Sequence, residues 1–181
     1  MKYKLGIGKN KNRTEKAFTM IELLVAMTLF LVLMGIAAGS FVKTMRTQRA
    51  IVALMAVNDN ASLTLEQMAR EMRTGYHFSR ISATEIQFVN AYNIVVSYRL
   101  NINNGAIERG TTDQSLITHY EKITADNVKV NNFHFELSGE TYGDGLQPRI
   151  TIAMSVTGTN DFLGGISTNI QTTVSSRILD Q

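Results

Sequence analysis

The chain has 181 residues, with no cysteine and one proline, so it can hold one modest domain plus an anchor but no disulfide framework or thiol nucleophile. Its 18 basic and 15 acidic side chains give a pI of about 9.2. The first 17 residues hold six lysines and arginines against one glutamate, whereas residues 18–181 hold 12 basic and 14 acidic side chains. The basic excess therefore belongs to a leader and gives no argument for a nucleic-acid-binding domain.

Residues 23–42 form an uncharged, mostly apolar run of 20 residues. As a helix this run would span roughly 30 Å, which is the thickness of the hydrocarbon core of a bilayer. The positive-inside rule keeps a basic leader in the cytoplasm. We therefore expect a single-pass protein of the cytoplasmic membrane, with its membrane segment at about residues 20–42 and its C-terminal part outside the cytoplasm.

Glu22 lies at the start of this apolar run, and an acidic side chain at mid-bilayer costs roughly 2.5–3.5 kcal/mol on insertion scales. Two alternative interpretations of this apolar segment assign no function to Glu22. One is an ordinary secretory signal cleaved near Ala37 and Ala38, and the other is an uncleaved signal anchor on an exported binding domain. Neither alternative explains the carboxylate.

The stretch "KAFTMIELLVAM" resembles the N-terminal signature of type IV pilins and type II secretion pseudopilins. In that family a basic leader ends in a small residue, followed by phenylalanine, a small polar residue, two apolar residues and a glutamate. The resemblance implies that prepilin peptidase cleaves between Ala17 and Phe18 and that the new amine of Phe18 is methylated. Glu22 would then face the N-terminal amine of a neighbouring subunit. Ala17 replaces the usual glycine by one methyl group, so we expect normal or slower cleavage.

The resemblance also implies the partners: other pilin or pseudopilin subunits, prepilin peptidase and an inner-membrane assembly platform. Gly35 and Gly39 are four residues apart in the apolar run, where small residues allow close helix packing. The machine served could be a pilus, a secretion pseudopilus or a competence filament. In each of them the chain would be a structural subunit assembled through its N-terminal helix.

We expect the N-terminal helix, here called the spine helix, to cover residues 18–74, a range that contains no proline. Apolar residues recur at steps of three and four after the membrane run, and Glu66 and Arg70 have the spacing of a helical ion pair. The members of the apolar stripe are Ile51, Leu54, Met55, Ala61, Leu65, Met68, Ala69 and Met72. The polar residues 58–60 could bend or restart the helix, and Gly75 is a suitable stop.

From residue 75 onward the pattern changes to short β-branched and aromatic runs bounded by Asn and Gly. The expected strands cover residues 85–90, 94–101, 106–109, 128–137, 149–157 and 169–179. Such runs predict an antiparallel sheet whose apolar face is covered by the amphipathic half of the helix. The expected fold is therefore α+β and pilin-like, with a leader at 1–17, a spine helix at 18–74 and a β-rich head at 75–181.

The head resembles that of a minor, priming type of pilin or pseudopilin more than that of a major repeating subunit. The segments that carry this likeness are "LEQMAREMRTG", "ATEIQFVN" and "QTTVSSRIL". Major subunits of the family are often shorter and more regular.

The sequence gives little sign of catalytic or metal chemistry. His77, His119 and His134 lie far apart, and no phosphate-binding loop or nucleophile motif is present. The turn around Asp144 lacks the second carboxylate of a calcium site. Basic residues of the head are scattered among acidic ones, which argues against nucleic acid. We therefore expect a protein that is not an enzyme and that has no cofactor and no metal.

Overall fold

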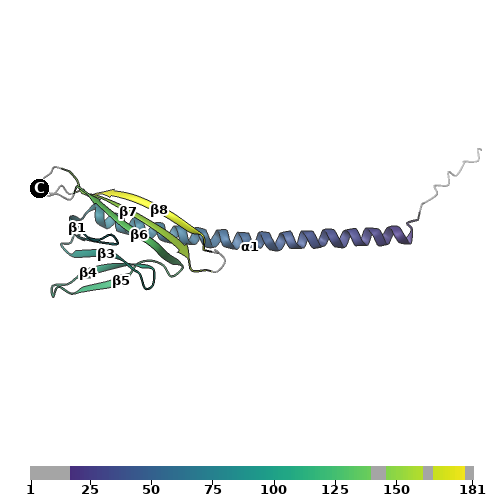
Figure 1. Cartoon of the computed structure of the whole chain (residues 1–181), viewed down its shortest axis with the longest axis horizontal. Coiled ribbons are helices and arrows are strands. Elements are labelled where there is room, and N and C mark those ends of the chain that lie inside the picture. The colour runs from purple at the N-terminus through teal and green to yellow at the C-terminus, as the bar shows by residue number, and fades with distance from the viewer. Residues whose placement is uncertain (1–16, 140–145, 161–164, 178–181) are drawn as a thin grey trace, which may run out of the picture. The chain divides into compact units, whose positions relative to one another are not determined.

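A computed structural model describes residues 17–139, 146–160 and 165–177. Three expectations lie outside these ranges: the basic leader up to residue 16, the turn at Asp144 and the last residues of the strand expected over 169–179. The described part contains one helix and eight strands, in the order α1, then β1 to β8 (Figure 1).

Helix α1 covers Met20–Arg73, 54 residues in one piece. The polar residues 58–60 do not interrupt it; instead the Asn60 amide donates to Asn127 Oδ1 at 2.8 Å, which ties the helix to the loop before β6. The helix therefore does not restart at these residues, which was one of the two possibilities that the polar residues raised. The helix does end just before Gly75, but that glycine has no left-handed φ. A Cβ atom there would lie 2.5 Å from the Phe88 ring, so close packing is what requires glycine.

The eight strands form two antiparallel sheets rather than the single sheet expected. The first has the order β1-β2-β3-β4-β5 and the second the order β6-β7-β8. Their bounds are β1 Tyr76–Ser82, β2 Glu85–Val89, β3 Val95–Asn101, β4 Ala106–Thr112, β5 Thr118–Lys122, β6 Val128–Ser138, β7 Arg149–Gly158 and β8 Ser167–Ser175. Two backbone hydrogen bonds join the sheets: Val130 N–H to the Gly105 carbonyl at 2.7 Å and Phe135 N–H to the Ala83 carbonyl at 2.9 Å.

Strands β1 and β5 were not among the expected strands. Both are edge strands of the first sheet, and only Phe78 of the two is buried. An edge strand with both faces mostly wet has no apolar alternation, which is the signal on which strand prediction depends.

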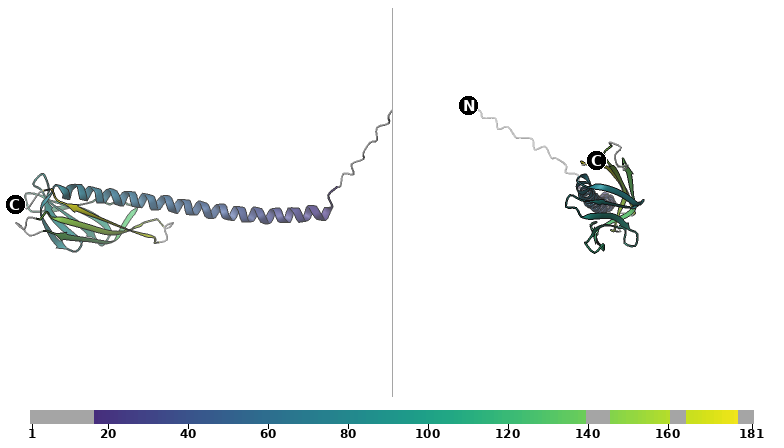
Figure 2. Two further views of the ribbon diagram at one scale, coloured as in Figure 1. Left: turned by 90° about the horizontal axis from the view of Figure 1, so that it is seen from above. Right: turned by 90° about the vertical axis from the view of Figure 1, so that its left-hand side faces the viewer.

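The core lies between the second half of α1 and the inner faces of both sheets, which lie on the same side of the helix (Figure 2). The predicted helix stripe is confirmed from Ala61 to Met72, with Leu65 and Met68 also buried. Ile51 and Met55, at 46% and 60% exposed, extend the stripe beyond the packed part. The sheets contribute Phe88, Tyr98, Phe133, Phe135, Ile150 and Ile152 among others.

Two hairpin turns of the first sheet repeat one geometry. In the β2–β3 turn, Asn90 Oδ1 accepts from the N–H groups of Tyr92 and Ile94, Asn90 N–H donates to the Ile94 carbonyl, and Asn93 is left-handed with φ 60°. Asparagine tolerates this conformation well. The turn therefore combines a side-chain cap with a residue suited to its backbone.

The β4–β5 turn makes the same bonds with different residues. Asp113 Oδ1 accepts from the N–H groups of Ser115 and Ile117, and Asp113 N–H donates to the Ile117 carbonyl. Leu116 takes the left-handed position with φ 61°, and its side chain is 86% exposed. A bulky residue in this conformation is strained, and no burial compensates the strain.

We predict that Leu116→Asn raises the free energy of unfolding by roughly 1 kcal/mol, because it relieves a left-handed leucine. The variant Asn93→Leu in the twin turn should lower it by more than this, because it also removes the hydrogen bond that Tyr76 Oη donates to Asn93 Oδ1 at 2.8 Å. Chemical unfolding of the full-length chain in detergent measures both. A less stable Leu116→Asn variant would show that the turn is not strained as described.

Candidate functional site

The expected processing site lies immediately before α1. Phe18 is 79% exposed, and residues 17–19 are not helical, so the Ala17–Phe18 bond lies in an open segment. Thr19 caps the helix: Glu22 N–H lies 3.1 Å from the Thr19 carbonyl and 3.4 Å from Thr19 Oγ1. The order Thr19-x-x-Glu22 is that of a capping box, a sequence signal that could have located this helix start.

Glu22 lies in the first turn of α1, where its negative charge also suits the positive end of the helix dipole. Its carboxylate has no hydrogen bond or ion pair within the part of the chain that the structure describes. The helix therefore offers the carboxylate a favourable position but no side-chain partner of its own.

The first half of α1 has an apolar surface on all sides. An 18-residue window has a mean hydropathy of 2.4, with no residue of that window buried, so the helix is long and apolar enough to cross a membrane. Every described residue from 17 to 49 is exposed. Cβ atoms added at Gly35 and Gly39 would meet nothing within 4 Å, so both positions leave an open strip on the helix. A surface of this kind requires lipid or neighbouring helices as cover.

A second charged cluster lies where the end of α1 meets the first sheet. Glu71 on the helix accepts four hydrogen bonds, from Arg109 Nε at 2.9 Å, Arg109 Nη2 at 2.6 Å, Tyr98 Oη at 2.6 Å and Asn90 Nδ2 at 3.1 Å. The side chains of Glu71 and Arg109 are 19% and 26% exposed. The cluster thus fastens the helix end to β3, to β4 and to the start of the β2–β3 turn.

The protonation of this cluster follows from its contacts. Burial by itself would raise the pKa of Glu71, but the hydrogen bonds from Arg109, Tyr98 and Asn90 outweigh it and lower the pKa from 4.5 to about 2. Burial raises the pKa of Tyr98 above its usual range, and the hydrogen bond to Glu71 raises it further. The hydrogen bond with Glu71 raises the pKa of Arg109. At neutral pH the cluster is therefore a fixed ion pair with a neutral tyrosine, which suits anchoring rather than proton transfer.

Neither the Glu71 cluster nor the Thr19 cap was predicted from the sequence. It did place Glu66 and Arg70 as a pair, and these side chains lie 2.8 Å apart. That pair is local, whereas the partners of Glu71 lie 19, 27 and 38 residues away along the chain. Pairing over such separations depends on strand register, which the sequence does not show.

We predict that Glu71→Gln lowers the free energy of unfolding at neutral pH by about 2 kcal/mol, because it leaves Arg109 partly buried without its charge partner. The pKa of Glu71 is lower in the folded than in the unfolded chain. Its stabilisation is therefore complete above pH 4.5 and is lost as the pH falls toward 2.

Unfolding curves of the full-length chain between pH 7 and pH 2 measure this effect. Glu71→Gln should remove part of the acid dependence, whereas Glu66→Gln in the exposed pair should leave it nearly unchanged. An acid profile of Glu71→Gln identical to that of the unaltered chain would contradict the cluster's role.

A family model described as "Prokaryotic N-terminal methylation motif" matches residues 12–38. No curated protein and no solved structure matched the chain. The matched stretch contains Ala17, Phe18, Glu22 and Gly35 and stops one residue before Gly39. It therefore covers the presumed cleavage point, the capped helix start and most of the apolar run.

The matched residues include two features of the structure: the open segment before the capped helix, and an apolar helix surface that needs cover. The rest of the chain has a pilin-like α+β arrangement, in which a long N-terminal helix packs on antiparallel sheets. The chain thus carries the prokaryotic N-terminal methylation motif, the prepilin-type signal that type IV pilins and pseudopilins share.

Proposed function

We propose that the chain is a minor structural subunit of a type IV pilus-like or type II secretion-like filament. The observation that carries the proposal is a methylation motif at residues 12–38 that includes the start of a helix whose first half is exposed and apolar on all sides. Lipid covers such a helix before assembly, and the helices of neighbouring subunits cover it afterwards. The chain would thus exist first as a membrane protein and then as part of a filament.

Processing by prepilin peptidase between Ala17 and Phe18 supplies the group that Glu22 lacks. Cleavage removes the basic leader and creates a cationic α-amino group on Phe18, which methylation modifies without removing the charge. The open conformation of residues 17–19 supports access to this bond. The cleaved chain then has one cation and one carboxylate within its first five residues.

In a filament, Glu22 would pair with the amine of Phe18 on a neighbouring subunit. Breaking a buried pair leaves one charge stranded at a cost of about 3–5 kcal/mol, so a wrong axial register is penalised. The pair would thus select the axial register between neighbouring subunits, and it would add little to the stability of the filament. Gly35 and Gly39 would allow neighbouring helices to approach closely once the register is set.

The head would lie outside the cytoplasm, at the cell surface or in the periplasm. The basic leader before an apolar helix supports this orientation by the positive-inside rule. The partners in assembly would be other pilin or pseudopilin subunits, the peptidase and an inner-membrane platform. The role is structural, with the helix as the assembly element and the head as the exposed element.

Replacing Glu22 tests this function. We predict that Glu22→Ala blocks incorporation into filaments sheared from the native host, because the Phe18 amine of the neighbouring subunit is left without a partner. Glu22→Asp should retain part of the incorporation, because it keeps the charge with a shorter reach. The chain should accumulate in the membrane with a folded head, which protease resistance measures.

Glu66→Ala is the matched control, because Glu66 is an exposed carboxylate on the same helix. It should assemble like the unaltered chain. Normal assembly of Glu22→Ala would contradict the proposed pairing, and loss of assembly in both variants would show that the effect is not specific to Glu22.

A further inference from the structure

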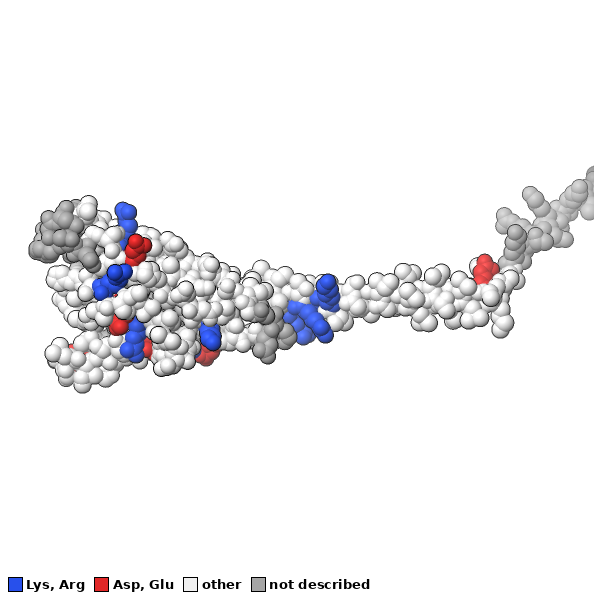
Figure 3. Space-filling model, viewed as in Figure 1, with Lys and Arg blue, Asp and Glu red and all other residues white. Residues whose placement is uncertain are grey.

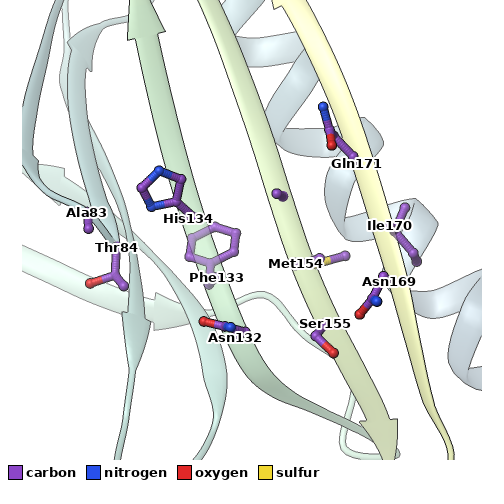
Figure 4. Close-up of a pocket in the computed structure, with 11 residues that line it drawn as sticks. Ala83, Thr84, Asn132, Phe133, His134, Met154, Ser155, Asn169, Ile170 and Gln171 are labelled. Atoms are coloured by element: carbon purple, nitrogen blue, oxygen red, sulfur yellow. The ribbon is translucent and has the colours of Figure 1, made fainter.

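A hollow lies on the outer face of the second sheet. It has a volume of about 750 Å³ and is bounded by β6, β7, β8 and the β1–β2 turn at Ala83 and Thr84 (Figure 4). Two hydrogen bonds hold that turn in place: Phe135 N–H donates to the Ala83 carbonyl at 2.9 Å, and Leu100 N–H donates to the Thr84 carbonyl at 3.2 Å. The wall and the floor of the hollow are therefore fixed relative to each other.

Two local departures from a regular sheet create the hollow. The register of β6 against β7 shifts between Val130 and Asn132, and this bulge leaves Asn131 and Asn132 both exposed. Bulges commonly re-aim a side chain in this way. In the next row, Ala153 stands between His134 and Gln171 where its β7 neighbours on the same face are Thr151 and Ser155. The short side chain of Ala153 leaves the space open.

Five polar side chains of the three strands line the hollow without an internal partner in the described part of the chain, whereas the Thr84 hydroxyl contacts Ser82 Oγ at 3.3 Å. Asn132, Ser155 and Asn169 form one row across the three strands, and His134 and Gln171 flank Ala153 in the next. None of these five side chains has a hydrogen-bond partner among the described residues.

The neighbouring rows on the same face are different. Thr151 and Thr173 lie 3.0 Å apart, and the Asn131 amide donates to Thr157 Oγ1 at 3.3 Å. The threonines of the rows beside the hollow thus have side-chain partners, whereas the five polar side chains at the hollow have none among the described residues.

The chemistry of the lining limits the ligand. No Lys, Arg, Asp or Glu lines the hollow, and the middle of this face is uncharged in the view of Figure 3. The apolar side chains Phe133 and Met154 belong to the core and are only 2% and 4% exposed, so they offer little apolar surface. Ile170, Ala83 and Ala153 add apolar surface beside the polar groups, so the lining is mixed and disfavours ionic ligands.

An extended peptide is also disfavoured. Strand β7 is hydrogen-bonded on both sides, so its backbone cannot form a ladder with an added strand at this place. Over the middle of the hollow, recognition must therefore come from side chains. Asn and Gln each offer an acceptor and two donors, and Ser and His add further donor and acceptor capacity. Such a set matches groups that are donor and acceptor at once, as sugar hydroxyls are.

We propose that this hollow is a binding site for a neutral saccharide. The side-chain amides of Asn132, Asn169 and Gln171 bind its hydroxyl groups, and the gap over Ala153 accepts the body of one sugar ring. The volume of the hollow lies in the range of small-ligand sites. The proposal is independent of filament assembly, because every residue involved belongs to the head.

Ligand-observed NMR titration of the full-length chain tests this site. The chain is kept in lauryldimethylamine oxide, a detergent without a sugar headgroup, and the probes are maltotriose, cellotriose and N,N′,N″-triacetylchitotriose. At least one should bind. Ala153→Thr fills the gap with a residue that strands favour, so it should leave the fold intact and weaken binding at least about tenfold.

Gln171→Ala removes one proposed hydrogen-bonding group, and Thr173→Ala is its control on the same strand and face outside the hollow. Binding should weaken with the first and persist with the second, with unchanged circular dichroism in both. A heparin oligosaccharide and an uncharged acetyl-tetraserine amide serve as competing ligand classes. No binding of any neutral trisaccharide, binding of a competing class alone, or equal binding by Ala153→Thr would overturn the proposal.

Discussion

Helix α1 is one continuous element that must meet two different requirements, and the rest of the structure depends on how it does so. From Val57 onward it has a buried stripe that completes the core of the head. Before that point none of its residues is buried, although most are apolar. The sheets of the head therefore bury the apolar stripe of the second half of the helix. The other half needs cover from outside the chain, which lipid and, in the proposed filament, the helices of neighbouring subunits would supply.

The two glutamates near the ends of this helix illustrate the same division. Glu71 is compensated within the chain by Arg109, Tyr98 and Asn90, and its pKa falls to about 2 as a result. Glu22 has no such partner among the described residues. A carboxylate that is left uncompensated in apolar surroundings is costly, and the proposed assembly would supply its partner, the Phe18 amine of a neighbouring subunit. The first carboxylate fixes the head, and the second is proposed to fix the register between subunits.

Local patterns predicted much of the fold. The 3.6-residue spacing of Ala61, Leu65, Met68 and Met72 located the buried stripe, because a helix face is set by nearby residues. Short β-branched and aromatic runs, together with the Asn and Gly turns that bound them, located six of the eight strands. The division into two sheets was not predictable, because strand pairing depends on contacts far apart in the sequence. For the same reason the Glu71 cluster and the hollow over Ala153 were not anticipated.

The residues of the candidate site were predicted in a different way from the fold. Ala17, Phe18 and Glu22 followed from the resemblance of a short segment to a known signature, and the family match supports that resemblance over residues 12–38. Composition alone gave only a basic leader and an apolar run, which a signal anchor would also have. The head carries no comparable signature, so its proposed ligand rests on geometry: a bulge, a small residue and a group of unpaired polar side chains.

The mass and N-terminal sequence of the mature protein, extracted from the membranes of its native host, test the central claim most directly. The account predicts a chain that starts at Phe18 and carries a methyl group on its amine. A start near Ala38, or an intact Met1, would contradict it, because Glu22 would then lack the amine with which it is proposed to pair.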